Sequence, residues 1–270
     1  SRFDGKFNVF KKKKRVFLQH GILWYVIEGL FCKNNHLDLF ICGSRKEYEV
    51  TKKQYGYPNG IVQYTGLCRF DNLHNIETKK QILVMPTWRT YIDRERFEES
   101  EYFKAYKELL CSPTLTHILA KYGYKLIFYP HFEFQSKISL FKQLTLSERV
   151  IIADMNYDVQ TLLKESEFLI TDFSSIYFDM VYMNKPVIFY QFDQEKYNIG
   201  HYKKALETRY IDTNKIGPIV MSHKDLLEKI EYTIVYKDKI LLENKDYYEQ
   251  IFELKDTQNN ERIFNAITKC

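Results

Sequence analysis

The stretch TDFSSIYFDM, residues 171–180, carries an unusual density of small hydroxyl and carboxyl groups. Thr171, Asp172, Ser174 and Ser175 come directly after the apolar run EFLI and before a stretch with a helical pattern. In an open parallel sheet, ligands bind outside the carboxyl ends of strands, where loops lead into helix N-termini. The free N–H groups at such a terminus suit a phosphate, and two serine hydroxyls would add two donors. The pattern indicates a phosphate cradle; the alternative is a helix cap formed by Asp172 or Ser174.

Other polar side chains follow strand-like runs in the same way. MPTWR places Thr87 and Arg89 after one run, FYPHF places His131 after the next, and FLQHG places His20 near the start of the chain. An arginine offers a forked, permanently charged donor for phosphate oxygens. A histidine can take a proton from an attacking hydroxyl. A lone histidine is more often structural, but together these residues would converge on one crevice and favour a site.

The elements that must position these residues follow from short apolar runs that alternate with amphipathic stretches. Strands are predicted in RVFLQ, HLDLFICGS, GIVQYTG, QILVMPTW, KLIFYP, RVIIAD, EFLIT and PVIFYQF. Helices are predicted in GILWYVIEGLF, RKEYEVTKKQYG, EYFKAYKELLCSPTLTHILAKYG (broken near Pro113), DVQTLLKES, SSIYFDMVYMN and SHKDLLEKI. Continuous apolar strands separated by helices indicate parallel sheets covered on both faces. The sequence therefore predicts a doubly wound α/β fold.

The polar connector FDNLHNIETKKQ, residues 70–81, predicts a domain boundary. We expect a Rossmann-like domain over residues 1–77, with about three strands, and a second with a fuller set over residues 78–236. Residues 237–270 are charged and helical in pattern, and we expect them to pack back against the first half.

Composition restricts the class of protein. The chain has 270 residues, of which 45% are hydrophobic and 28% charged, as in ordinary packed proteins. No segment approaches the ~18 consecutive apolar residues of a membrane span. The five cysteines lack the spacing of metal ligands, which favours buried thiols in a reducing compartment. No signal peptide follows Ser1. Both observations lead us to expect a cytoplasmic location. Asp172, Asp179 and Asp193 could attract a divalent ion, but no spacing demands one, and capping or solvated carboxylates are the alternative.

The net charge of +5 is unevenly placed, because KKKKR puts five cations together from Lys11 to Arg15. Each such charge is attracted to anionic lipid by about 1 kcal/mol near the surface. Peripheral contact with an anionic membrane is one interpretation, and a solvated charge run is the other. The run lacks interleaved aromatic residues or a known module, so nucleic acid is not expected as a partner. The motifs GxxxxGK[ST], GxGxxG, HExxH and GxSxG are also absent, which argues against P-loop nucleotidases, dinucleotide dehydrogenases, zinc proteases and serine hydrolases.

These residues together resemble a known family. QHG, PTWR, the strand that ends in His131, and the block DVQTLLKESEFLITDFSSIYFDMVYMNKPVIFYQFDQEKY (Asp158 to Tyr197) are similar to the CDP-glycerol:poly(glycerophosphate) glycerophosphotransferases of teichoic acid and capsule synthesis. The resemblance covers roughly residues 15 to 235, and the long block is its most specific part.

The resemblance implies a two-domain, GT-B-like fold that transfers glycerol phosphate from CDP-glycerol to an acceptor hydroxyl and releases CMP. The resemblance implies that His20 is the candidate general base on the acceptor side. It also implies that Arg89 and His131 hold and neutralise the pyrophosphate. The donor pocket would be lined by Thr171, Asp172, Ser174 and Ser175, beside Thr87. Phosphoryl transfer is mostly positioning and charge neutralisation, which agrees with donors at strand ends. No cofactor is implied, and the partners would be CDP-glycerol and a lipid-linked or polysaccharide acceptor.

Two features depart from the family pattern. About 19 residues precede His20, where family members usually carry a fuller domain, so we expect a truncated N-terminal domain. QHGI also lacks the HGTP of teichoic acid polymerases, which leaves CDP-ribitol open as the donor. Two other functions stay open: a GT-B glycosyltransferase that uses a nucleotide sugar, and a non-catalytic nucleotide-binding module of a larger synthase.

Overall fold

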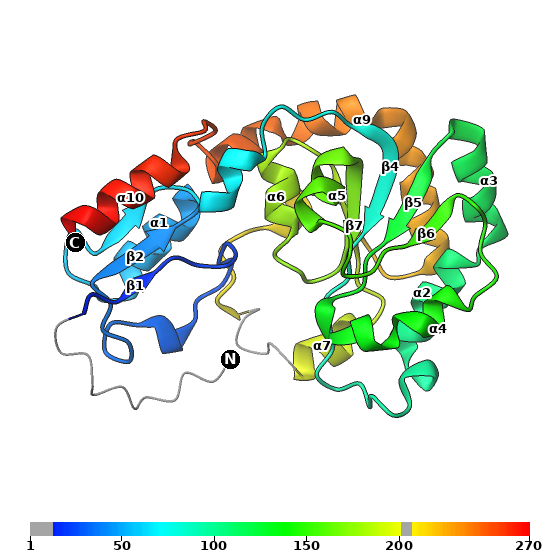
Figure 1. Cartoon of the computed structure of the whole chain (residues 1–270), viewed down its shortest axis with the longest axis horizontal. Helices are drawn as coiled ribbons and strands as arrows, with labels where there is room; N and C mark the ends of the chain where they lie inside the picture. The colour runs from blue at the N-terminus through cyan, green and yellow to red at the C-terminus, as the bar shows by residue number, and fades with distance from the viewer. Residues whose placement is uncertain (1–12, 201–206) are drawn as a thin grey trace.

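The computed structural model describes residues 13–200 and 207–270, which form two parallel sheets side by side (Figure 1). The first sheet has three strands in the order β1-β2-β3. They are β1 (Val16–Phe17), β2 (Leu39–Cys42) and β3 (Val62–Tyr64). The predicted α/β class, with two parallel-sheet units, is confirmed.

The second sheet has six strands in the order β6-β5-β4-β7-β8-β9. They are β4 (Lys79–Val84), β5 (Lys125–Phe128), β6 (Val150–Ile152), β7 (Ser166–Thr171), β8 (Val187–Tyr190) and β9 (Ile219–Val220). The chain builds outward from β4 to β5 and β6, then returns to the other side of β4 with β7. This reversal makes the carboxyl ends of β4 and β7 a topological switch point, where open parallel sheets bind their ligands.

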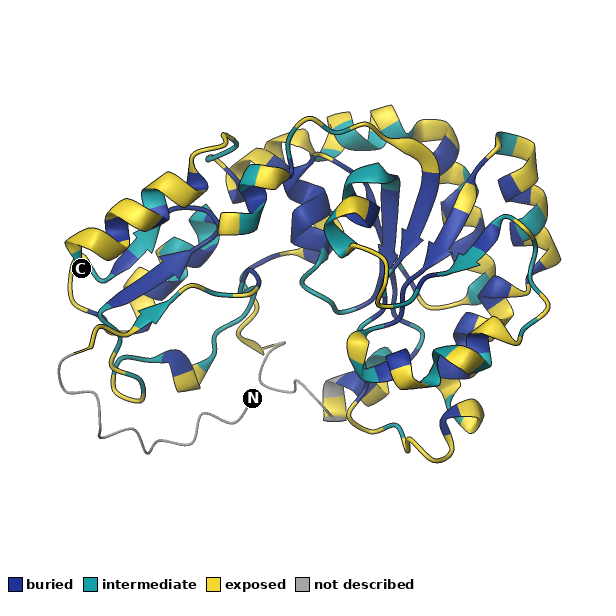
Figure 2. Ribbon diagram, viewed as in Figure 1, coloured by how far each residue is buried: buried dark blue, intermediate teal, exposed yellow. Residues whose placement is uncertain are grey.

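Helices cover both faces of the second sheet. One is long, α9 (His223–Ile251), and the others are α2 (Glu101–Leu110), α3 (Pro113–Tyr122), α5 (Val159–Glu165) and α6 (Tyr177–Tyr182). Within β4, Ile82 and Val84 join the core cluster that contains residues of α2, α3 and α9, whereas Leu83 joins the cluster that contains residues of α5 and α6. Successive strand residues point to opposite faces, so a strand that is apolar throughout requires helices on both sides. Figure 2 shows these strands as the most deeply buried part of the molecule.

Side chains cap the N-terminal ends of several helices, as the sequence signals require. Ser44 accepts a hydrogen bond at the start of α1 (Arg45–Gln54), and Ser222 does so at the start of α9. Shorter segments complete the described chain: α4 (Ile138–Lys142), α7 (Gln194–Gly200) and the 3-10 turns η1 (Glu28–Leu30), η2 (Cys68–Asn72), η3 (Phe97–Glu99), η4 (Phe132–Lys137) and η5 (Thr213–Lys215).

The last helix, α10 (Asn259–Lys269), lies against the first sheet (Figure 1). Ile263 and Ala266 of α10 share a core cluster with Leu39 and Ile41 of β2. The predicted boundary between residues 236 and 237 falls inside α9, at Tyr236, whose backbone is non-helical and kinks the helix.

One predicted helix, GILWYVIEGLF, is wrong. The stretch is irregular and contains only the 3-10 turn η1. Its backbone N–H groups bind partners far along the chain: Leu23 N donates to Glu47 at 2.7 Å, and Ile27 N donates to the Tyr55 hydroxyl at 3.0 Å. These tertiary contacts override a weak helix propensity, since the stretch is rich in β-branched and aromatic residues.

Gly217 provides a test of the packing around β9. A Cβ at this position would lie 1.9 Å from the backbone oxygen of Val187 in β8. Gly217→Ala must therefore push β8 and the loop apart, and we expect it to lower the free energy of unfolding by about 1–3 kcal/mol or more. Urea denaturation measures the change. Gly29→Ala is the control, because a Cβ on Gly29 meets nothing within 4 Å; equal stability of the two variants would contradict the packing described.

Candidate functional site

The second sheet brings several predicted site residues to one edge. His131 follows β5, Thr87 follows β4, and Ser174 and Ser175 follow β7, and these three strands are neighbours in the order β5-β4-β7. All four residues are partly exposed. The carboxyl ends of the strands therefore place a histidine and three hydroxyl groups along one rim at the switch point.

Arg89 lies beneath this rim and not on it. Its side chain is fully buried, and Nε and Nη2 donate to the two oxygens of Asp193 at 2.6 and 3.0 Å. Nη1 donates to Asp172 at 2.8 Å and to the carbonyl of Thr87 at 2.9 Å. The sequence predicted that this guanidinium would hold a phosphate, but the structure turns these donors toward the protein's own carboxylates. Burial alone would lower the pKa of Arg89, yet the two carboxylates raise it well above its usual value, so it stays charged.

Asp172 and Thr171 also turn inward. The Asp172 carboxylate accepts hydrogen bonds from the backbone N–H of Thr87 at 2.9 Å and of Phe173 at 2.6 Å, besides that from Arg89. Burial raises the pKa of Asp172, and these donors offset part of that rise. The Thr171 hydroxyl donates to the carbonyl of Met85 at 2.7 Å. These side chains fix the backbone that carries the serines.

Among the described residues, no side chain accepts a hydrogen bond as the N-cap of α6, so the alternative interpretation, in which Asp172 or Ser174 caps this helix, is not supported. Ser174 Oγ accepts a hydrogen bond from Ile176 N at 3.4 Å, within the turn that precedes the helix. The helix begins only at Tyr177, later than the sequence predicted.

Aromatic rings enclose the Arg89 guanidinium. It lies 5.2 Å from the centroid of Phe173 and 5.0 Å from that of Tyr197, and these two rings stack at 3.7 Å with 5° between their planes. Because the guanidinium is about equally far from these two stacked rings, it lies beside the stack and not over either ring face. No local pattern predicts this cluster, because its members are spread over more than one hundred residues.

The QHG loop of the first sheet reaches the serine turn of the second. His20 is exposed, and the next residue, Gly21, packs so closely that a Cβ on it would lie 2.9 Å from Ser175 Oγ. Only glycine allows this approach without a shift of the neighbouring side chain. The two stretches that the sequence singled out therefore meet.

An ion pair between Arg69 of η2 and Asp179 of α6 helps to hold the QHG loop beside the serine turn. Nε and Nη2 of Arg69 each donate to one Asp179 oxygen at 2.7 Å, and Nη1 donates to the carbonyl of His20 at 2.9 Å. The Asp179 side chain is buried and that of Arg69 is about one-third exposed. Such a forked pair fixes orientation as well as distance. Sequence reasoning missed Arg69, because no local spacing relates it to a partner 110 residues away.

His131 is half-buried beside Trp88, with ring centroids 6.3 Å apart. Burial lowers its pKa, which favours the neutral imidazole at pH 7. Its Nδ1 accepts a hydrogen bond from Glu133 N at 3.3 Å, so the remaining ring proton belongs on Nε2. The ring can therefore donate one hydrogen bond from Nε2 to a ligand.

In the described ranges, no group of three or more histidine, cysteine or acidic side chains is placed to hold a metal ion. The carboxylates that the sequence suggested for a divalent ion are paired with arginines instead: Asp172 and Asp193 with Arg89, and Asp179 with Arg69.

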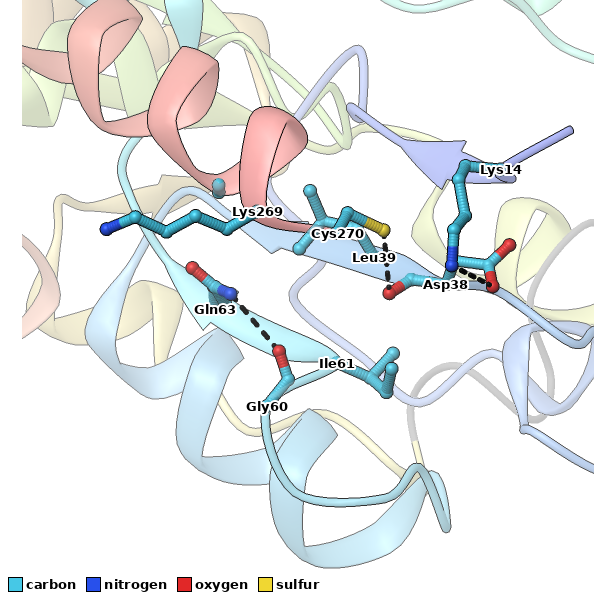
Figure 3. Close-up of a pocket in the computed structure, with 9 residues that line it drawn as sticks. Lys14, Asp38, Leu39, Gly60, Ile61, Gln63, Lys269 and Cys270 are labelled. Carbon is cyan, nitrogen blue, oxygen red and sulfur yellow. Dashed lines mark hydrogen bonds and ion pairs between the residues drawn. The ribbon is translucent and has the colours of Figure 1, made fainter.

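A cavity of about 220 Å³ lies elsewhere, beneath the C-terminal end of α10 (Figure 3). It is lined by Lys14, Asp38, Leu39, Gly60, Ile61, Gln63, Ala266, Lys269 and Cys270. Polar groups on its walls pair with one another: Lys14 Nζ lies 3.7 Å from Asp38, and Gln63 donates to the carbonyl of Gly60 at 3.1 Å. The cavity is separate from the QHG loop and the serine turn.

No helix in the described part of the chain is long and apolar enough to cross a lipid bilayer. Of the cations in KKKKR, Lys11 and Lys12 lie outside the described residues. Arg15 is exposed; its backbone N–H donates to Asp38 at 2.8 Å and its Nη2 donates to Asn35 at 2.7 Å. The Lys14 side chain is 63% exposed.

Two parallel-sheet units, with a loop of one meeting the switch point of the other, define a GT-B-like protein. The wall teichoic acid polymerase TagF has this fold: its structure matches 96% of this chain and 68% of its own, with a TM-score of 0.71 and 19% identity. A UDP-N-acetylglucosamine 2-epimerase from Listeria monocytogenes matches 86% of this chain and 60% of its own, with a TM-score of 0.53 and 15% identity.

The chain belongs to the CDP-glycerol:poly(glycerophosphate) glycerophosphotransferase family, whose model matches residues 11–269. It is 32% identical to the minor teichoic acid biosynthesis protein GgaB of Bacillus subtilis, over 93% of this chain and 29% of that protein. It is 26% identical to a teichoic acid glycerol-phosphate transferase of Staphylococcus aureus, over 71% of this chain and 46% of that protein. The chain thus spans less than half the length of these two relatives, and the resemblance seen in the sequence is confirmed.

Replacement of Arg89 tests its internal role. Arg89→Ala would leave Asp172 and Asp193 buried without their cation, and we expect it to lower the free energy of unfolding by about 3–5 kcal/mol, as for other broken buried pairs. Urea denaturation measures this loss. The control is Arg94→Ala, whose partner is Glu133 at the surface and whose loss is expected to be about 0–1 kcal/mol. A loss below 1 kcal/mol for Arg89→Ala would contradict the internal role.

Proposed function

We propose that this chain carries the active site of a glycerophosphotransferase. It would transfer glycerol phosphate from CDP-glycerol to a hydroxyl of a teichoic acid or related surface-polymer acceptor and release CMP. Membership of the family supports the reaction class. The observation that carries the proposal is the contact between Gly21 and Ser175, which sets the candidate base beside the candidate phosphate turn.

The rim of the second sheet would bind the diphosphate of the donor. Ser174 and Ser175 offer hydroxyl donors, Thr87 offers another, and His131 offers its Nε2–H. Hydrogen bonds to a charged phosphate are shorter and stronger than those between neutral groups. The backbone that presents these donors would be fixed by three side chains that lie beneath it: Arg89, Thr171 and Asp172. We therefore propose a positioning role for these three residues in place of direct contact.

His20 would act as the general base on the acceptor side. The acceptor oxygen attacks the phosphorus that bears glycerol, a new P–O bond forms, and the P–O bond to CMP breaks with its electron pair passing to CMP. The acceptor proton passes to the His20 imidazole. Proton transfer by a positioned side chain contributes roughly 10²- to 10⁴-fold to such a rate. A transferring phosphoryl group otherwise needs mainly alignment and charge stabilisation, which the rim supplies.

An acceptor linked to lipid would bring the protein to the cytoplasmic face of a membrane. The exposed Lys14 side chain supports a peripheral contact with anionic lipid. Whether a divalent ion binds together with the donor is tested by adding EDTA to the transfer assay.

Removal of the His20 imidazole separates chemistry from binding. We expect His20→Ala to lower kcat by roughly 10²- to 10⁴-fold, because the proton acceptor is lost, while the Kd for CDP-glycerol changes less than about twofold. Turnover is followed by release of CMP, and binding by calorimetry. His117→Ala, an exposed histidine on α3, is the control. Equal loss of binding and turnover in His20→Ala would remove His20 from the role of base.

Ser175→Ala tests the phosphate cradle. Loss of a hydrogen bond to a charged group costs about 1.5–3 kcal/mol, so the Kd for CDP-glycerol should rise roughly 10- to 150-fold. Ser139→Ala, at an exposed position of α4, should leave the Kd unchanged. An unchanged affinity in Ser175→Ala would mean that the turn binds no phosphate.

A further inference from the structure

Glu47 is a buried acidic residue that lies directly beneath the QHG loop. It belongs to α1 of the first sheet's domain, and its side chain is inaccessible to solvent. Oε1 accepts hydrogen bonds from the side-chain amide of Gln19 and from the backbone N–H of Leu23, both at 2.7 Å. Oε2 accepts one from the backbone N–H of Gly43, also at 2.7 Å. A single carboxylate therefore connects the loop to the end of β2.

The two contacts of Oε1 lie on either side of the candidate base. Gln19 precedes His20, and Leu23 follows it by three residues, so one oxygen atom holds both ends of the short loop that carries the imidazole. The backbone of Gln19 has a φ of 61°, in the left-handed region that residues other than glycine rarely adopt. Its amide also donates to the carbonyl of Ile41 at 3.1 Å. A strained backbone of this kind persists only where surrounding contacts impose it.

The opposite side of the loop is held by Arg69 of η2, which is itself paired with Asp179 of the second domain. Arg69 donates to the carbonyl of His20, as described above. Beneath the loop, Ile22 is buried, and its Cδ1 would lie 2.3 Å from a Cβ placed on Gly43. The loop is thus packed closely against β2, and two polar contacts fix its position: the Glu47 carboxylate and the hydrogen bond from the Gln19 amide to Ile41.

Glu47 keeps a carboxyl group at a place where burial disfavours its charge. Burial raises its pKa to about 7, and the N–H groups of Leu23 and Gly43 only partly offset this rise. The titratable groups that face it are Cys42 on β2, Tyr55 at the end of α1, and Tyr210, and burial raises the pKa of each, so these remain neutral. A glutamine of the same size would avoid the cost of a buried charge. However, an amide cannot accept hydrogen bonds on both of its terminal atoms, as the carboxylate does here.

We propose that Glu47 is a positioning residue for His20: its carboxylate fixes both ends of the QHG loop and thereby aims the imidazole at the acceptor hydroxyl. The inference rests on the proposed role of His20 as the base. It predicts that loss of the carboxylate lowers turnover without weakening the donor complex, because the serine turn and His131 belong to the other domain. A displacement of about 1 Å in a catalytic group can lower a rate by roughly 10²-fold.

The test compares Glu47→Gln with Glu49→Gln, which makes the same change in charge at an exposed position of the same helix. For Glu47→Gln we expect kcat to fall by roughly 10- to 100-fold, with the Kd for CDP-glycerol close to that of the parent chain. The urea midpoint should fall as well, because the amide nitrogen would face a buried backbone N–H. Glu49→Gln should match the parent in all three. Parental turnover in Glu47→Gln, or a Kd that rises as much as kcat falls, would overturn the proposal.

Adding Glu47→Gln to His20→Ala separates a positioning effect on His20 from an effect on the rest of the site. In His20→Ala, the residual turnover should be the same within about twofold whether or not Glu47→Gln is added, since residues that act through one another are not additive. A further tenfold loss in the double variant would show that Glu47 acts independently of His20. If His20→Ala itself keeps full turnover, the proposed function of His20 fails, and this result is distinct from either outcome for Glu47.

A milder variant guards against a failure of Glu47→Gln to fold. Gln19→Asn keeps an amide that tolerates the left-handed backbone, but its side chain is too short by one methylene group to reach Glu47. We expect kcat to fall in the same direction and by less, with unchanged donor affinity. Hydrogen exchange at Leu23 N–H provides a readout independent of activity: Glu47→Gln should lose protection there, and full protection would contradict the loop contact.

Discussion

The buried contact of Arg89 with Asp172 and Asp193 is the interaction on which the candidate site depends. It joins the chain segments that follow β4, β7 and β8, and through the Thr87 and Phe173 backbones it sets where the serine turn stands. Three charges in a dry interior are costly unless each is paired, and four hydrogen bonds from one guanidinium meet that requirement. The rim can therefore be rigid without a glycine-rich loop, because the buried Arg89 and Asp172 side chains hold the loops that form it.

The second requirement is that two domains present their residues to each other in a fixed relation. Arg69 and Asp179 form a forked pair across this boundary, and the same guanidinium holds the carbonyl of His20. Gly21 lets the loop approach Ser175 to the distance at which any larger residue would collide. In this arrangement the proposed base and the proposed phosphate turn would be aligned before any ligand arrives, so less ordering would be required when a donor binds.

The sequence predicted the sheets well, because strands buried on both faces are apolar throughout and hydroxyl-rich turns follow them directly. It placed TDFSS correctly at the end of β7 and QHG correctly after β1. It failed where long-range contacts decide the outcome. The pattern predicts a helix in GILWYVIEGLF, yet the N–H groups of Leu23 and Ile27 donate to Glu47 and Tyr55. Arg89 turns inward because two carboxylates from distant segments enclose it. No local spacing encodes such partners.

The central claim is that the serine turn and the QHG loop form one site for a CDP-activated polyol phosphate. Calorimetric titration of the 270-residue chain with CDP-glycerol, CDP-ribitol, UDP-glucose and CMP tests it most directly. The account predicts saturable binding of a CDP-polyol, and binding of CMP that is weaker because the second phosphate is missing. Binding of UDP-glucose alone, or equal affinity for all four compounds, would contradict it.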